Sequence, residues 1–259
     1  MKLHVIKIGG NIIDNPDALN SFLANFTLIP GYKILVHGGG KIATQMAKNL
    51  GIETQMVDGR RVTDKKSLQI VTMVYAGWIN KSIVAHLQSK KCNAMGLTGP
   101  DGGLIKAKKR NPTPIDFGFV GDIDEVNTGF IHQQLLNNTR LVIAPITHDG
   151  AGQLLNTNAD TIAQTIATAM SNKYKVHLVY GFEKEGVLAD VNNEASVISS
   201  INNLTYSQLK KENVIFEGMI PKIDNAFLAL HGGVQSVIIG KAEKLIELMN
   251  GTAGTTITI

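Results

Sequence analysis

The regular alternation of strand-like and helix-like segments constrains this chain most. Apolar runs rich in β-branched residues recur almost from end to end, and segments with helical periodicity separate them. A strand that is apolar throughout is typical of a parallel sheet, because such a sheet is covered by helices on both faces. We therefore expect an α/β fold with a central, mainly parallel sheet. The expected strands cover 4–8, 33–37, 140–146, 175–180 and 234–240, and the expected helices lie near 16–27, 41–50, 66–90, 158–172, 205–212, 221–231 and 241–249.

The middle of the chain, 93–131, departs from this alternation. It is rich in glycine and turn residues, and its short alternating strands predict hairpins. We expect an antiparallel flap here, attached to the first half of the chain. A length of 259 residues allows one large α/β domain or two modest lobes, and the most plausible lobe boundary is near Asn172.

Composition excludes several classes of protein. The net charge of +4 is spread over short lysine pairs, without the basic stripe that nucleic-acid binding requires. The single cysteine, Cys92, excludes an internal disulfide and fits a reducing compartment. The opening residues lack the apolar core of a signal peptide, and the apolar runs are too short to span a membrane. We expect a cytoplasmic protein that binds neither nucleic acid nor membrane.

The first expected strand ends in a lysine followed by glycines. Lys7 closes an otherwise apolar strand, where an ammonium group is costly unless it meets an anion or water. Gly9 and Gly10 follow, and glycines let backbone N–H groups approach a phosphate closely. A lysine at a sheet edge before an ordinary turn is the alternative. The chain contains no G-x-x-x-x-G-K-[ST] loop.

The second expected strand ends in three consecutive glycines. Gly38, Gly39 and Gly40 exceed what a tight turn needs and precede a helix, which favours close approach of the backbone to a ligand. The same stretch matches the G-x-G-x-x-A dinucleotide pattern, with Asp58 near the place of a ribose-binding carboxylate. An NAD-dependent dehydrogenase is therefore an alternative function. We interpret His37, just before the glycines, as structural.

A loop that enters a helix carries more polar groups than capping requires. Asn156, Asn158 and Asp160 alternate there, although a helix N-terminus needs only one capping side chain. A polar site at the helix N-terminus explains all three, and a simple cap is the alternative. The helix dipole makes Asp160 a poor proton acceptor, so this carboxylate is better suited to holding lysines in position.

Further cations lie near two other expected helices. Arg60 and Arg61 precede a long helix, and one guanidinium could bind a substrate carboxylate or form a surface ion pair. Lys222 follows Pro221 in the first turn of another helix, where an ammonium group is unfavourable unless an anion is also present. A solvated lysine is the alternative at this position.

Taken together, these features predict phosphoryl transfer. Two glycine turns, two lysines, a carboxylate and an arginine suit chemistry that depends on positioning and on stabilising negative charge. If the acceptor is itself a carboxylate, the reaction needs no general base. A dehydrogenase, in contrast, leaves Lys7, Asp160 and Lys222 without roles.

The motifs resemble the amino-acid kinase family, specifically its members that act on N-acyl-glutamates. The resemblance follows the chain in order through VIKIGGNII, ILVHGGGK, GRRVTD, MGLTGPDGGLIKAKK, GFVGDID, LLNTNAD, EGMIPKIDNA and GTTI. It implies an open αβα sandwich, with acyl-amino-acid binding and dimerisation in 1–172 and ATP binding in 173–259. It also implies ATP-dependent phosphorylation of the side-chain carboxylate of an N-acyl-L-glutamate, the second step of arginine biosynthesis. Acetyl is the default acyl group and succinyl a variant; kinases of aspartate, UMP or carbamate are alternatives within the family.

The resemblance also implies roles for single residues. Lys7 and Lys222 would stabilise the transferring phosphoryl group, with Asp160 orienting both. The backbone N–H groups of Gly9, Gly10 and Gly39 would contact the ATP phosphates, and Mg²⁺ would be carried by those phosphates. The N-acyl-glutamate would be held by Gly39, Gly40, Arg61, Asn156 and Asn158.

Some positions depart from the family pattern. Tyr180 and Gly181 stand where Ser/Thr-Asp is usual, and Thr256 stands where a basic residue is common. The chain starts directly at the first strand, without the N-terminal helix of hexameric, arginine-inhibited members. We therefore expect a homodimer without arginine feedback, joined through helix 66–90. The expected interface stripe, for which core packing is the alternative, comprises Leu68, Val71, Tyr75, Trp78, Ile79 and Ile83.

Overall fold

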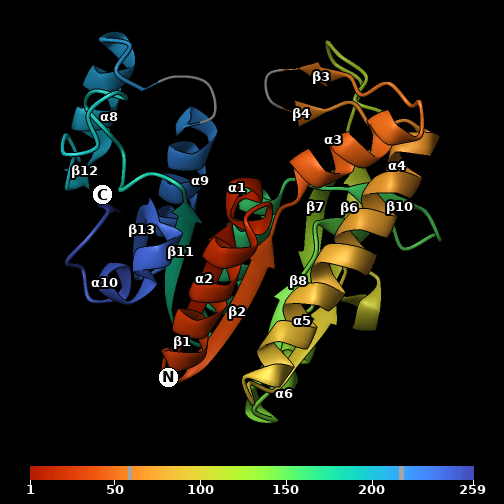
Figure 1. The fold of residues 1–259 in the computed structure, drawn as a ribbon, viewed down its shortest axis with the longest axis horizontal. Helices are drawn as coiled ribbons and strands as arrows, with labels where there is room; N and C mark the ends of the chain where they lie inside the picture. Colours follow the sequence, from red (N-terminus) through yellow and green to blue (C-terminus); the bar gives the residue numbers. More distant parts are fainter. Residues whose placement is uncertain (58–59, 216–218) are drawn as a thin grey trace.

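A computed structural model describes residues 1–57, 60–215 and 219–259 (Figure 1). Within these residues an eight-stranded sheet runs in the order β12-β14-β13-β11-β1-β2-β8-β5. Neighbouring strands are parallel except at β13 and β14, which pair antiparallel. The strands are β1 (Lys2–Ile8), β2 (Tyr32–His37), β5 (Ala94–Leu97), β8 (Arg140–Ile143), β11 (Lys175–Phe182), β12 (Ser200–Ile201), β13 (Ser236–Lys241) and β14 (Thr255–Ile257).

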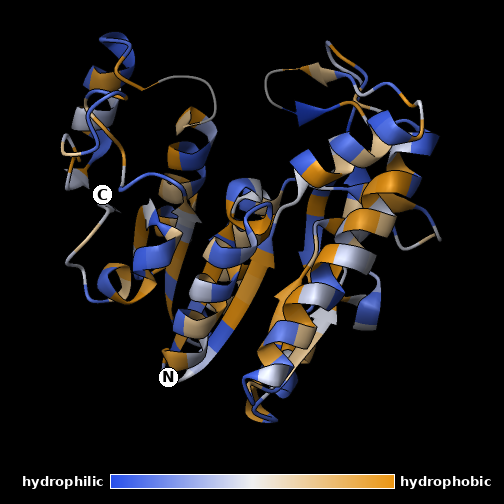
Figure 2. Cartoon of the chain, in the orientation of Figure 1, coloured by the Kyte–Doolittle hydropathy of each residue, from blue (hydrophilic) through white to orange (hydrophobic). Residues whose placement is uncertain are grey.

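Helices cover both faces of this sheet, which confirms the expected αβα sandwich. Successive residues of β1 alternate between two hydrophobic cores: Leu3 and Val5 belong to one, Ile6 and Ile8 to the other. Figure 2 shows apolar strands between helices that carry polar residues on their outer sides. One core includes α6 (Thr128–Leu136), α7 (Ala159–Met170), α8 (Asn203–Lys211) and α9 (Met219–His231). The other includes α1 (Gly10–Ile13), α2 (Pro16–Leu28), α3 (Gly40–Asn49), α4 (Lys65–Val71), a π-helix (Thr72–Ile79), α5 (Asn80–Ser89) and α10 (Leu245–Met249).

The sheet continues across the expected lobe boundary at Asn172. That residue lies between α7 and β11, and β11 then pairs with β1 in parallel from Lys2↔Lys175 to Ile8↔Gly181. The two halves of the chain therefore share one sheet, and the carboxyl ends of β1 and β11 meet at the same edge. The expected division, with acyl-amino-acid binding in 1–172 and ATP binding in 173–259, stays a prediction.

The expected flap at 93–131 is only partly antiparallel. Its centre pairs β6 (Ile105–Lys109) with β7 (Gly121–Val126) antiparallel, as expected. Its start is different, because β5 joins the large sheet parallel to β8, and its end already belongs to α6. The expected strand 140–146 is also two strands in two sheets. A smaller sheet has the order β10-β9-β6-β7 and contains β9 (Ile146–His148) and β10 (Leu154–Asn156); β3 (Met56–Val57) and β4 (Arg60–Arg61) form a separate ribbon.

The long helix expected over 66–90 forms from α4, the π-helix and α5. Five residues of its predicted interface stripe are buried in the chain's own core: Leu68, Val71, Tyr75, Ile79 and Ile83. Trp78, in contrast, is 70% exposed. The wider i→i+5 turns of the π-helix shift the side-chain positions relative to a 3.6-residue repeat, which explains why Trp78 leaves the buried side. Core packing therefore accounts for most of the stripe.

Among the described residues, no helix combines the length and the apolar character needed to cross a bilayer.

Candidate active site

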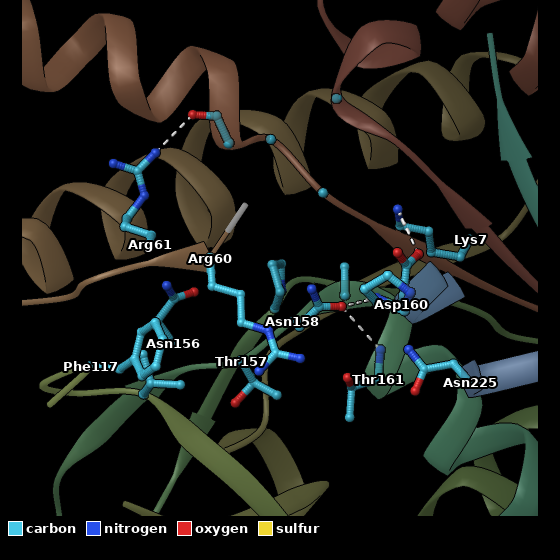
Figure 3. Close-up of a pocket in the computed structure, with 18 of the residues that line it drawn as sticks. Lys7, Arg60, Arg61, Phe117, Asn156, Thr157, Asn158, Asp160, Thr161 and Asn225 are labelled. Atoms are coloured by element: carbon cyan, nitrogen blue, oxygen red, sulfur yellow. Dashed lines mark hydrogen bonds and ion pairs between the residues drawn. The ribbon is translucent and has the colours of Figure 1, made fainter. Parts of the chain in front are cut away.

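A cavity of about 620 Å³ opens at the carboxyl ends of β1 and β2 (Figure 3). Ligands of parallel α/β sheets bind at this edge, because the strands end there and the following helices begin there. The residues that line it come from both glycine turns, the β3–β4 ribbon, the start of α7 and one side of α9. They include Lys7, Gly10, Gly38, Gly39, Gly40, Arg60, Arg61, Tyr75, Asn156, Asn158, Asp160, Thr161, Asp224 and Asn225.

Two lysines and an aspartate form the centre of the site. Lys7 continues the row of Leu3 and Val5 on β1, so its side chain points toward α7. Its Nζ lies 2.7 Å from Oδ1 of Asp160, and a dashed line marks this ion pair in Figure 3. Lys222, in the first turn of α9, places its Nζ 3.0 Å from the other carboxylate oxygen. We call these three residues the Lys–Asp–Lys triad. Sequence reasoning named all three, and the fold brings them into contact.

The triad is charged and suited to an anion. Burial raises the pKa of the Asp160 carboxyl, but Lys7 and Lys222 outweigh it and hold that pKa well below its usual range. Burial lowers the pKa of Lys7, and the Asp160 carboxylate opposes this shift. The three side chains are each less than one-fifth exposed, so solvent screens them weakly. Two ammonium groups around one carboxylate leave a net positive charge, and Asp160 is a poor proton acceptor.

Tyr180, one of the departures from the family pattern, lies behind the triad. It is buried, and the Nζ of Lys222 lies 5.2 Å from the centre of its ring. Its hydroxyl donates to the backbone carbonyl of Asp160 at 3.3 Å. The ring therefore packs beneath Lys222 and helps to fix the start of α7. Gly181 is used in a different way, because its carbonyl accepts the N–H of Gly9 at 3.2 Å.

The two glycine turns meet beside the triad. The N–H of Gly38 donates to the carbonyl of Ile8 at 3.1 Å, and α1 and α3 begin at Gly10 and Gly40. Gly10, Gly39 and Gly40 line the cavity. The N–H of Gly9 is engaged by Gly181 and joins β1 to β11, so contact of Gly9 with a phosphate stays a prediction.

Gly39 has a backbone conformation that only glycine adopts without strain. Its φ is +148°, and an added Cβ would lie 2.2 Å from Cδ1 of Ile79. We expect Gly39→Ala to lower the kcat of phosphoryl transfer by at least about tenfold, because it would displace the loop whose N–H groups we expect to contact the phosphates. Steady-state kinetics on the folded variant measure this effect. Gly251 also has positive φ (+71°) but open space around it, so Gly251→Ala is the control and should keep wild-type kcat. Equal kcat for both variants would contradict the expectation.

The two arginines of GRRVTD have different surroundings. Arg61 is buried and donates to Thr54 Oγ1 at 3.1 Å, to the Gly40 carbonyl at 3.0 Å and to Thr44 Oγ1 at 2.7 Å. It therefore supports the second glycine turn from the side of the cavity. Arg60 is exposed, and Figure 3 shows its guanidinium extending into the middle of the cavity. Arg61 as a substrate ligand stays a prediction, and Arg60 joins it as a candidate.

The polar residues before α7 divide between capping and the cavity. The Asn158 side-chain oxygen caps α7, accepting from the N–H groups of Asp160 at 2.8 Å and Thr161 at 3.2 Å. Asn156 donates to Thr63 Oγ1 at 3.0 Å. Both line the cavity, so Asn158 can cap α7 and still border a ligand; substrate binding by either asparagine stays a prediction.

Sequence reasoning missed several residues that line the cavity. Asn225 projects from α9 toward the start of α7 in Figure 3, and Thr161 faces it. Asn225 lies three positions after Lys222, one helical turn away, which was an available signal. Four residues named in the sequence patterns, Asp58, Gly59, Glu217 and Gly218, lie outside the described residues.

This arrangement belongs to an enzyme that stabilises and transfers an anionic group, because its charges hold a phosphoryl group better than they move a proton. Similarity to known proteins assigns the chain to one family within that class of enzymes. The chain belongs to the Amino acid kinase family, whose model matches residues 2–241.

Similar proteins agree with this placement. The chain is 56% identical over 257 residues to an acetylglutamate kinase of Cytophaga hutchinsonii, covering 98% of this chain and 97% of that protein. It is 35% identical to an acetylglutamate kinase of Methanopyrus kandleri, covering 95% and 97% of the two chains. Family membership leaves the dehydrogenase alternative without support.

Solved structures with lower identity show the same fold. N-acetylglutamate synthase from Neisseria gonorrhoeae, complexed with coenzyme A and N-acetyl-glutamate, matches with a TM-score of 0.84 at 21% identity. The match covers 99% of this chain and 59% of that longer chain. Carbamate kinase from Giardia lamblia bound to AMP-PNP matches with a TM-score of 0.69 at 15% identity, over 99% and 98% of the two chains.

Proposed function

We propose that this chain transfers the γ-phosphoryl group of ATP to the side-chain carboxylate of N-acetyl-L-glutamate, as in the second step of arginine biosynthesis. The observation that carries the proposal is the Lys–Asp–Lys triad at the mouth of the glycine turns, with ion pairs of 2.7 and 3.0 Å. The relatives named acetylglutamate kinase support the choice of substrate.

The reaction needs little covalent help from the protein. A carboxylate oxygen of the substrate attacks the γ-phosphorus, the bond to the β-phosphate oxygen breaks, and ADP leaves with that electron pair. No proton moves in this step, which fits an Asp160 carboxyl whose pKa is held low by two lysines. Lys7 and Lys222 stabilise the charge on the transferring group, and Asp160 keeps both ammonium groups in position.

The backbone supplies the remaining stabilisation. N–H groups of Gly10 and Gly39 contact the phosphates, and Gly39 and Gly40 border the acyl-glutamate. Arg61, Asn156 and Asn158, with Arg60 beside them, hold the part of the substrate that does not react. In this proposal 1–172 binds the acyl-amino acid and 173–259 binds ATP.

Use of ATP follows from the kinase family, and we propose that Mg²⁺ arrives on its phosphates. Phosphate oxygens are hard ligands of the kind that Mg²⁺ prefers. The Asp160 carboxylate is not available to the ion, because each of its oxygens already faces an ammonium group. In this proposal the positive charge near the transferring group has two sources: the lysines belong to the protein, and Mg²⁺ would come with the nucleotide.

An ATP-dependent hydroxamate assay tests the proposal. The purified chain is incubated with Mg-ATP, hydroxylamine and one acceptor at a time: N-acetyl-L-glutamate, N-succinyl-L-glutamate, free L-glutamate or L-aspartate. We expect hydroxamate with N-acetyl-L-glutamate and much less with free glutamate or aspartate. A preference for the succinyl compound would change the acyl group but keep the reaction. No product with either acyl-glutamate would refute the proposal.

We also propose a homodimer in which the exposed side of the long helix forms the contact. Met73 is 58% and Trp78 is 70% exposed on the π-helix, and large exposed apolar side chains on one element often mark an interface. We expect light scattering to give twice the mass of one chain and Trp78→Glu to give one chain mass. Leu204→Glu, at an 83% exposed site on α8, is the control and should remain dimeric. A monomeric wild-type protein would contradict the proposal.

A further inference from the structure

His37 is a buried histidine beside the glycine turns, and each of its two ring nitrogens has a hydrogen-bond partner. It ends β2, has no exposed surface and lies directly before Gly38. Its Nδ1 lies 2.8 Å from the Gly38 carbonyl oxygen, and its Nε2 lies 3.1 Å from Nδ2 of Asn80. Asn80 is equally buried and is the first residue of α5. The mechanism described above gives neither side chain a role.

The partners fix which ring nitrogen carries the proton. A carbonyl oxygen only accepts, so Nδ1 must donate to Gly38. The Asn80 amide nitrogen also donates to the Val142 carbonyl at 3.0 Å, and its oxygen accepts from Lys81 Nζ at 3.2 Å. This orientation makes Asn80 the donor toward Nε2. His37 is therefore neutral and protonated on Nδ1, in agreement with burial, which lowers its pKa to about 4.

Both backbone polar groups of Gly38 are held by hydrogen bonds. Its N–H donates to the Ile8 carbonyl at 3.1 Å, and its carbonyl accepts from the His37 ring. In a trans peptide the C=O and the following N–H point in opposite directions. Because the Gly38 carbonyl points at the buried ring, the N–H of Gly39 points away from it. Gly39 lines the cavity, so the cavity is the side open to an N–H that points away from the ring.

We propose that His37 is a positioning residue that orients the Gly39 N–H toward the transferring phosphoryl group by holding the Gly38 carbonyl. This inference rests on the proposed kinase function. Asn80 fixes the ring from behind, and the neighbouring Ile79 packs against Gly39, where an added Cβ would come within 2.2 Å of its Cδ1. The junction of the π-helix and α5 thus supports both the ring and the turn.

Replacing His37 by Asn or by Gln distinguishes the contact of the ring with Gly38 from its contact with Asn80. The amide nitrogen of Asn is bonded to Cγ, as Nδ1 of histidine is, so His37→Asn can keep the bond to Gly38. The amide of Gln reaches as far as Nε2, so His37→Gln can keep only the contact with Asn80. His37→Phe keeps the ring volume and loses both. We expect kcat within about threefold of wild type for His37→Asn, and a loss of about 10- to 100-fold for the other two, with smaller changes in KM.

The kinetics are compared at temperatures where thermal unfolding shows each variant to be folded. A purely structural role would lower the stability of all three variants without separating Asn from Gln in kcat. Equal kcat for the Asn and Gln variants, or wild-type kcat for a folded His37→Phe, would overturn the proposal. If the Phe variant does not fold, the Asn–Gln pair still decides.

A second measurement does not depend on turnover. NMR of protein that carries ¹⁵N in its histidine rings reports which ring nitrogen of His37 carries the proton. We expect a neutral His37 protonated on Nδ1, and a proton on Nε2 would overturn the proposal. A wild-type protein without kinase activity would count against the proposed function, whereas the tautomer tests the hydrogen bond to Gly38 separately.

Discussion

Lys222→Met is expected to lower kcat about 10²- to 10³-fold, because it removes one of the two ammonium groups that stabilise the transferring phosphoryl group. The side chain is only 10% exposed and its Nζ is 3.0 Å from Asp160, so water cannot replace the lost charge in the same place. Methionine retains most of the volume against the Tyr180 ring. The loss should therefore appear in kcat for N-acetyl-L-glutamate more than in the thermal unfolding temperature.

Lys7→Met should behave in the same way, since Lys7 holds the other oxygen of Asp160 at 2.7 Å. Lys175→Met provides the matched control. Lys175 is exposed at the opposite end of β11, and its variant should keep wild-type kcat. Near-wild-type turnover in a folded Lys7→Met or Lys222→Met protein would mean that the triad does not stabilise the reaction.

Asp160→Asn is expected to lower activity and to make it strongly dependent on pH. The wild-type carboxylate opposes the burial that lowers the pKa of Lys7. Without it, the positive charge of Lys222 acts on Lys7 unopposed in a buried site, and the pKa of Lys7 falls further. The protonated lysine is the active form, so the variant should gain kcat as pH falls and lose it as pH rises through the lowered pKa. The wild-type rate should change little over the same interval, which pH–rate profiles measure.

The same variant should also be less stable. Removing the partner of buried charges costs about 3–5 kcal/mol of unfolding free energy, measured by denaturant titration. Asp124→Asn is the control, because Asp124 forms an exposed pair with Lys108 at 3.6 Å and its loss should cost about 1 kcal/mol or less. A flat pH–rate profile at wild-type height for Asp160→Asn would contradict the role given to the carboxylate.

The centre of the main sheet could be predicted because its strands are long and apolar on both sides. The strands from β1, β2, β11 and β13 all match continuous apolar runs in the chain. The two-residue strands β3, β4 and β12 could not be found in this way, since pairing with a neighbour, not a local pattern, defines them. The run 140–146 was taken as one strand because its residues stay apolar across the point where the chain leaves the large sheet for the smaller one.

The triad could be predicted because the charge of each member is unfavourable or unneeded in its local sequence. A lysine in an apolar strand, a lysine at a helix start and a surplus carboxylate at another helix start each need a partner elsewhere. The signal is not sufficient by itself, as Lys33 demonstrates. It also lies in an apolar strand, yet its Nζ donates to the carbonyls of Phe26, Thr27 and Ile29 at 2.6 to 3.0 Å, near the end of α2.

The difference between Arg60 and Arg61 lies beyond sequence reasoning. Adjacent residues of a strand point to opposite sides, so one arginine can face the protein while the other faces the cavity. Nothing in GRRVTD indicates which is which, and the structure gives the protein side to Arg61. Trp78 is similar, because a π-helix changes the side-chain repeat without a recognisable pattern.

The most direct test of the central claim follows an oxygen atom of the substrate. N-acetyl-L-glutamate labelled with ¹⁸O in its side-chain carboxylate is incubated with the protein, Mg-ATP and hydroxylamine. Attack of the carboxylate on the γ-phosphorus forms an acyl phosphate, and hydroxylamine then releases phosphate that retains one substrate oxygen. We expect phosphorus NMR to show inorganic phosphate carrying one ¹⁸O, and Lys222→Met to form it far more slowly. Phosphate without the label, or none at all, would contradict phosphoryl transfer to this carboxylate.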